Sequence, residues 1–150
     1  MIDPARLGEH IHGPLGWLSA AALVHPALLL RRPSRPLRAH LAVSLAAGIV
    51  TLAAILGAIL YPSYRERLRQ PIFASSTTFG YLFERKEHLA FGAVFLAWAG
   101  AITYAAQLRC EDAATADALR KASHRAFVAA AAFAVLTAIL GTLVASYRSF

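Results

Sequence analysis

Residues 39–61 read AHLAVSLAAGIVTLAAILGAILY, a run of 23 residues without a charged side chain. A helix needs about 20 apolar residues to cross the hydrocarbon core of a bilayer. Three other stretches have a similar length and composition: GPLGWLSAAALVHPALLL (13–30), HLAFGAVFLAWAGAITYAAQL (88–108) and HRAFVAAAAFAVLTAILGTLVA (124–145). Because none of them alternates with period two, membrane strands are excluded. We predict an all-α integral membrane protein, an up-and-down four-helix bundle forming one transmembrane domain over residues 1–150.

The overall composition agrees with this prediction. Of the 150 residues, 58% are hydrophobic and 15% are charged, whereas a soluble domain is about half apolar and a quarter charged. The single cysteine, Cys110, excludes a disulfide framework, an iron–sulfur cluster and a cysteine-based zinc site. The net charge of +7 comes from basic residues that flank the apolar stretches, so it does not call for a nucleic-acid partner.

The four spans predict which segments share a side of the membrane. Both termini and the long interfacial loop 62–87 fall on one side, and the two shorter connections fall on the other. Basic residues are densest in RRPSRPLR (31–38), and cytoplasmic loops carry an excess of Lys and Arg. We therefore expect a bacterial inner-membrane protein with its termini in the periplasm.

The chain also resembles a duplicated helix hairpin. TLAAILGAILYPSYR from Thr51 parallels VLTAILGTLVASYR from Val135, and His40 and Gly57 match His124 and Gly141 at an offset of 84 residues. Glu9-His10-Ile11 matches Glu87-His88-Leu89 at an offset of 78 residues. Such a pattern predicts two parallel repeats related by an axis along the membrane normal. Chance similarity between Ala- and Leu-rich helices is the alternative.

Histidines carry most of the functional information. Each span has one at or near its start, and in an up-and-down bundle the first and third helices can lie diagonally, as can the second and fourth. This predicts the pairs His10/His88 and His40/His124, one near each membrane surface. Two facing imidazoles are what a b-type haem requires as axial ligands, so two haems are expected.

Several alternatives surround this ligand set. His12 and His25 are alternative ligands on the first helix, and basic residues near the histidines are candidates for binding haem propionates: Arg38, Arg125 and Arg85. The competing interpretation of the histidines and arginines is that they are ordinary interfacial residues.

The 62–87 loop is basic and aromatic. We expect a short interfacial helix over 63–69, followed by a turn containing Pro71 and Gly80. The loop offers a docking surface or a quinone site, with four candidate residues: Tyr81, Phe83, Glu84 and Arg85. Glu84 lies four residues before His88, so its carboxylate is a candidate to orient that imidazole.

With the histidines placed, the chain resembles the small four-helix b-type cytochromes of respiratory membranes, in the style of cytochrome b561 and of the membrane anchors of quinone-linked enzymes. The resemblance covers all four spans and depends on His10, His40, His88 and His124. It implies haem held between transmembrane histidines, and electron transfer between a quinol pool and another membrane or periplasmic subunit.

We therefore expect a di-haem electron-transfer subunit rather than a complete enzyme. A cofactor-free accessory subunit of a larger membrane complex is the second hypothesis, and a His-lined metal permease is the third. No acidic residue lies in the middle of any span, which argues against a proton-relay pump or a cation transporter.

Overall fold

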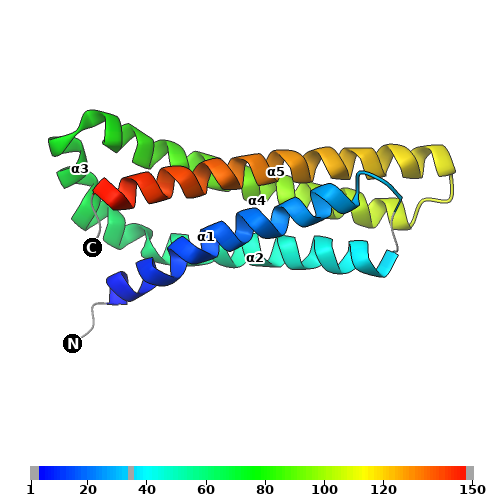
Figure 1. Ribbon diagram of the computed structural model, residues 1–150, viewed down its shortest axis with the longest axis horizontal. Helices are drawn as coiled ribbons and strands as arrows, with labels where there is room; N and C mark the ends of the chain where they lie inside the picture. The colour runs from blue at the N-terminus through cyan, green and yellow to red at the C-terminus, as the bar shows by residue number, and fades with distance from the viewer. Residues whose placement is uncertain (1–3, 34–35, 148–150) are drawn as a thin grey trace.

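The computed structural model describes residues 4–33 and 36–147, which form helices with short connections (Figure 1). The elements are α1 (Pro4–Leu29), α2 (Pro36–Tyr64), a π-helical segment η1 (Arg65–Arg69), α3 (Gln70–Ser75), α4 (Thr77–Leu108) and α5 (Ala113–Tyr147). No strand occurs among the residues in these two ranges. The prediction of an all-α helical bundle is confirmed.

Within residues 4–33 and 36–147, three helical stretches are long and apolar enough to cross a membrane: the continuous stretch Pro36–Ser75, α4 and α5. With 26 residues, α1 has the length of a span, about 1.5 Å per residue, but its prolines and histidines lower its mean hydropathy. The helices are therefore those of an integral membrane protein. That α1 also crosses the membrane stays a prediction.

The long helices pack in a ring. The first hairpin pairs α1 with α2 and the second pairs α4 with α5, while α1 also packs against α5, and α2 against α4. Consequently α1 lies diagonally from α4, and α2 from α5. Figure 1 shows that α1 begins, α5 ends and α3 lies at one end of the bundle, the terminal end. The connections α1–α2 and α4–α5 lie at the opposite end, the loop end.

Small residues let the helices approach closely. Ala20, Ala46, Ala97 and Ala130 are at most 2% exposed in the core shared by the four long helices. Transmembrane interfaces favour such residues because lipid supplies no hydrophobic drive between helices, and close van der Waals packing replaces it. The alanine content of the chain thus fills the bundle axis.

Glycines extend this close packing between α4 and α5. A Cβ atom added at Gly92 would lie 2.5 Å from the Phe133 ring, and one at Gly100 would lie 2.9 Å from the Phe127 ring. Beside the second contact, the buried Ser123 hydroxyl donates a 2.8 Å hydrogen bond to the Gly100 carbonyl. The two rings therefore rest directly on the backbone of α4.

The segment 62–87 is helical rather than a loop: the helix expected over 63–69 is present, as the end of α2 and η1, but the turn expected after it is absent. Apart from Ser76, these residues are helical, and neither Pro71 nor Gly80 forms a turn. Pro71 lies in the first turn of α3, where its missing N–H matters least. Gly80 lies in α4, where the Phe73 ring fills the space that a side chain would need. Pro71 thus lies at the start of a helix, and Gly80 allows close packing inside one.

Ser76 makes the one sharp change of direction in that segment. Its backbone is extended, with φ −160° and ψ 110°, and its Oγ accepts a 3.4 Å hydrogen bond from the Phe79 N–H. Serine is favoured at such N-cap positions. The chain therefore folds back at the terminal end, where a second small core forms from Leu68, Ile72, Phe83 and Val144.

Candidate functional site

A cavity of about 290 Å³ lies at the terminal end, between the α2–η1 junction and the first turns of α4. Its lining residues are Tyr61, Arg65, Arg69, Phe83, Glu84, Glu87 and His88. Two arginines, two glutamates and a histidine give this cavity a strongly polar lining. We call it the terminal cavity.

Helix geometry explains how the lining is assembled. Pro62 lies inside α2 and lacks the N–H that would bond one turn back, and the π-helical segment η1 follows three residues later. π-Helical turns are rare and occur often at functional sites. Here the altered register brings Arg65 and Arg69 to the wall opposite Glu84 and His88 of α4.

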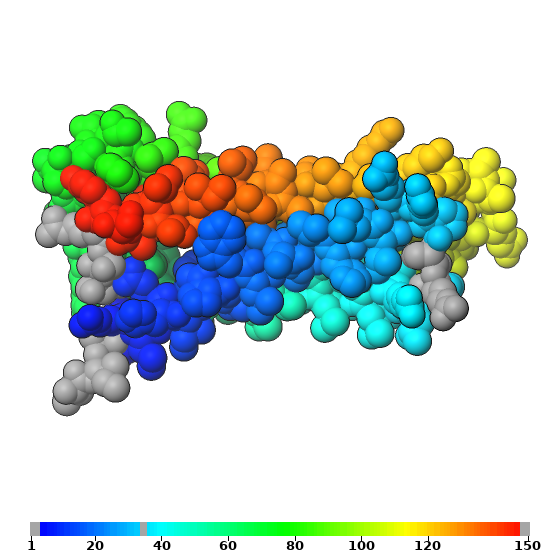
Figure 2. Space-filling model, in the orientation of Figure 1, coloured from blue at the N-terminus to red at the C-terminus, as the bar shows by residue number. Residues whose placement is uncertain are grey.

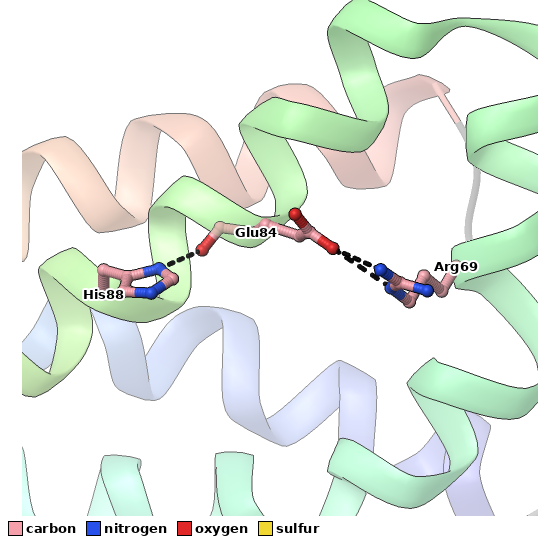
Figure 3. Close-up of polar contacts among 3 residues, drawn as sticks. All are labelled: Arg69, Glu84 and His88. Atoms are coloured by element: carbon pink, nitrogen blue, oxygen red, sulfur yellow. Dashed lines mark hydrogen bonds and ion pairs between the residues drawn. The ribbon is translucent and has the colours of Figure 1, made fainter.

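An ion pair closes one side of the terminal cavity (Figure 3). Arg69 donates from Nε (3.1 Å) and Nη2 (2.6 Å) to Oε1 of Glu84. Both side chains are partly exposed, at 42% and 34%, so the pair orients η1 against α4 more than it stabilises the fold.

His88 is held by the backbone and not by a carboxylate. Its Nδ1 lies 2.9 Å from the Glu84 carbonyl oxygen, one turn back on α4 (Figure 3). The expectation that the Glu84 carboxylate orients His88 is therefore wrong, because that carboxylate binds Arg69 instead. With Nδ1 donating to the carbonyl, Nε2 is left as an acceptor for another partner.

A second polar group lies behind the Phe83 wall. The Lys86 Nζ lies 4.8 Å from the Phe83 ring centre and 5.2 Å from that of Tyr64. His12 of α1 packs against α2 nearby. The His12 ring lies 3.0 Å from the place that a Cβ atom of Gly57 would take. Its Nδ1 is buried and has no hydrogen-bond partner among the described residues. The pattern of histidines alone did not reveal the role of Gly57 in admitting this ring.

The loop end has its own polar contacts, and they are structural. Arg120 donates to the Leu30 carbonyl (2.7 Å) and to Asp117, and the Tyr104 hydroxyl donates to the Pro36 carbonyl (3.2 Å). The two hydrogen bonds to the Leu30 and Pro36 carbonyl groups join the second hairpin to the first. They border a cavity of about 250 Å³ that neither His40 nor His124 lines.

The structure does not bring His40 and His124 together. The His124 Nδ1 lies 2.7 Å from the Ala27 carbonyl of α1, whereas the exposed His40 has its ring 6.4 Å from that of Tyr104 on α4. One imidazole is thus directed to the α5–α1 interface and the other to the α2–α4 interface, on opposite sides of the ring of helices. This arrangement does not fit a haem held between the two.

The other proposed ligands are similarly dispersed. His88 borders the terminal cavity, but the lining of that cavity does not include His10, which is exposed on α1. His25 is also exposed, and so are all three propionate candidates: Arg38, Arg85 and Arg125. Of the quinone-site candidates, Phe83 and Glu84 line the terminal cavity, while Tyr81 and Arg85 are exposed outside it.

Sequence reasoning missed the arginines of this site. Arg65 and Arg69 were part of an expected interfacial helix, and their spacing of four residues was a signal that both share a face. Among the described residues, no group of three or more His, Cys, Asp or Glu side chains is placed to hold a metal ion. No protein family, curated protein or solved structure matches the chain.

Proposed function

We propose that this chain is an accessory subunit of a larger membrane assembly, without a redox cofactor of its own. This is the second hypothesis raised by the sequence. A larger partner protein in the plane of the membrane and the lipid bilayer are then its main contacts. We expect the membrane to be a bacterial inner membrane and the terminal end to face the periplasm.

The observation that carries the proposal is an apolar ridge on the outer face of α4, in which three of the four side chains are aromatic. Phe91, Phe95, Trp98 and Ile102 follow one another at helical spacing and are 63%, 72%, 47% and 65% exposed. Trp98 lies at mid-span, whereas membrane tryptophans concentrate at the two interfaces, where Trp17 of α1 lies. Large aromatic side chains are enriched where proteins contact one another.

The polar groups of the spans support a structural role. Trp98 donates to Thr51 on α2 (3.0 Å), and Trp17 donates to Thr142 on α5 (3.2 Å). Both bonds join one hairpin to the other. Ser123 and His124 also make hydrogen bonds between helices. The polar side chains of the helices thus join one helix to another.

Site-specific cross-linking in the native membrane tests this proposal. A photo-reactive amino acid at Phe95 should form an adduct with one larger membrane protein. The same group at Leu136, which is 47% exposed on α5, should react with lipid and serves as the matched control. Lipid adducts alone at Phe95, or an adduct of twice the chain's mass, would contradict the proposal.

The di-haem cytochrome is the second candidate function. His40 and His124 occupy equivalent places in the two hairpins, each directed from a second helix toward the first helix of the other hairpin, so a haem between them would require both helices to rotate about their axes. An absorption spectrum of the purified protein before and after dithionite decides between the two candidates. Soret and α bands that disappear on His40→Ala and His124→Ala would replace the accessory-subunit proposal. Flat spectra would remove the cytochrome.

A further inference from the structure

The charges of the terminal cavity sum to zero but are only half paired. Arg69 and Glu84 bind each other. Arg65 and Glu87 form neither a hydrogen bond nor an ion pair with any residue in the described part of the chain. Burial raises the pKa of Glu87, and the charge of Lys86, whose ammonium group lies over the Tyr64 and Phe83 rings, opposes this shift. Arg65 and Glu87 are therefore available to a ligand that carries an anionic group for Arg65 and a cationic group for Glu87.

The depth of the terminal cavity identifies the class of ligand. Tyr61 ends the apolar stretch 39–61, and His88 begins the stretch 88–108, so the cavity lies where hydrocarbon gives way to headgroups. Just inside this level, the half-buried Ala54 and the exposed Ala58 share the face of α2 that carries Tyr61. A ligand there meets charge at one end and an apolar helix face at the other, so it is an amphiphile.

We propose that the terminal cavity binds the headgroup of a zwitterionic phospholipid with a primary ammonium, a phosphoethanolamine. Arg65 donates to the phosphate oxygens, because guanidinium groups match phosphate geometry. The Glu87 carboxylate accepts from the ammonium, and the acyl chains lie along the face of α2 that carries Tyr61, Ala58 and Ala54. Basic pockets between membrane helices are known to bind the phosphates of lipid headgroups.

The chemistry separates this ligand from its relatives. A phosphocholine headgroup has the phosphate and a positive charge, but its quaternary nitrogen has no N–H to donate to Glu87. A phosphoglycerol headgroup has no cation, and inorganic phosphate has neither a cation nor acyl chains. Because a hydrogen bond to a charged group is worth about 1.5–3 kcal/mol, the loss of one corresponds to about tenfold in affinity or more.

Native mass spectrometry of the full-length protein in detergent tests the proposal with defined lipids. Phosphatidylethanolamine, phosphatidylcholine and phosphatidylglycerol with identical acyl chains, and inorganic phosphate, are titrated separately. We expect phosphatidylethanolamine to bind about tenfold more tightly than the other two lipids, and phosphate alone not to bind. Glu87→Gln should reduce its binding to that of phosphatidylcholine and should not weaken phosphatidylglycerol, while Arg65→Gln should weaken all three lipids.

Matched controls exist on the same elements. Arg85→Gln and Glu66→Gln remove one charge of each sign from exposed positions outside the terminal cavity, and should leave the lipid ranking intact. Equal binding of the three lipids to the unaltered protein overturns the proposal without any variant. Displacement of phosphatidylethanolamine by a short-chain quinol would also overturn it, because the terminal cavity would then be a quinone site.

Discussion

Gly100 and Gly141 both lie inside long helices, but their surroundings differ, and this difference decides how each affects the packing of the helices. Gly100 carries the Phe127 ring, which is fully buried, whereas no atom lies within 4 Å of a Cβ placed at Gly141. Gly57, the repeat partner of Gly141, meets the His12 ring instead. The sequence repeat therefore places glycines at matching positions, and the packing uses only one of the pair.

Substitution of these glycines gives a residue-scale prediction. Gly100→Ala should destabilise the protein by about 1–3 kcal/mol, because neither the buried ring nor the helix backbone can move freely to admit the methyl group. Gly141→Ala should instead be neutral or stabilise by up to about 1 kcal/mol, through helix propensity. Denaturant unfolding followed by circular dichroism measures both. Similar losses at the two sites would contradict this account of α4–α5 packing.

At the scale of single elements, most helix ends were predictable in kind but not in position. The apolar stretch 88–108 is the C-terminal part of α4, and this helix begins eleven residues before the stretch, at Thr77. The helical turns that precede the span contain no long apolar run, so the sequence pattern does not predict them. Tertiary contacts stabilise these turns, for example the Phe79 ring stacked on the Tyr147 ring at 4.1 Å. For the same reason α3 was assigned to the loop that follows the short helix expected over 63–69.

The start of α5 yields a prediction at this scale. The Asp112 carboxylate accepts a 2.7 Å hydrogen bond from the Thr115 N–H, and hydrogen bonds from Thr115 lower the pKa of Asp112 below its ordinary value. A group whose pKa is lowered on folding stabilises the protein above its unfolded pKa, about 3.9, and this contribution is lost as the pH falls through the folded pKa.

The measurement compares melting temperatures between pH 7 and pH 2. Asp112→Ala should lower the melting temperature at pH 7, and this loss should shrink toward pH 2 as the carboxyl group takes up a proton. Asp112→Asn should retain part of the cap, since asparagine also caps helices, and should lose the pH dependence. Glu111→Gln, on the exposed neighbouring residue, is the control. A loss for Asp112→Ala that is equal at both pH values would contradict the capping role.

For the whole molecule, the two ends are chemically different. The terminal end has a charged cavity, a π-helical segment and a second small core, whereas the loop end has short connections held by Arg120 and Tyr104. Figure 2 shows the long side of the molecule between these ends, with α1 and α5 lying along it. An elongated bundle of this kind presents one end to each side of a membrane.

Cysteine accessibility tests this topology. Cys110 is the only cysteine and lies at the loop end, so a membrane-impermeant thiol reagent should label it from the cytoplasmic side alone. In a Cys110→Ser background, Ser75→Cys at the terminal end should be labelled from the periplasmic side alone. Labelling of both positions from the same side would contradict the bundle as a transmembrane unit, and a reversed pattern would invert the predicted orientation.

The sequence by itself determined that this protein is an all-α membrane bundle. Long uncharged runs must bury in lipid, and a helix satisfies its backbone hydrogen bonds locally, so no knowledge of distant residues is needed. Only the tertiary structure decided which side chains meet. The rotation of each helix about its axis is set by close packing between helices, at contacts such as Gly100 with Phe127 and Gly57 with His12. That rotation separated His40 from His124 and brought Arg65, Arg69, Glu84 and Glu87 around one cavity.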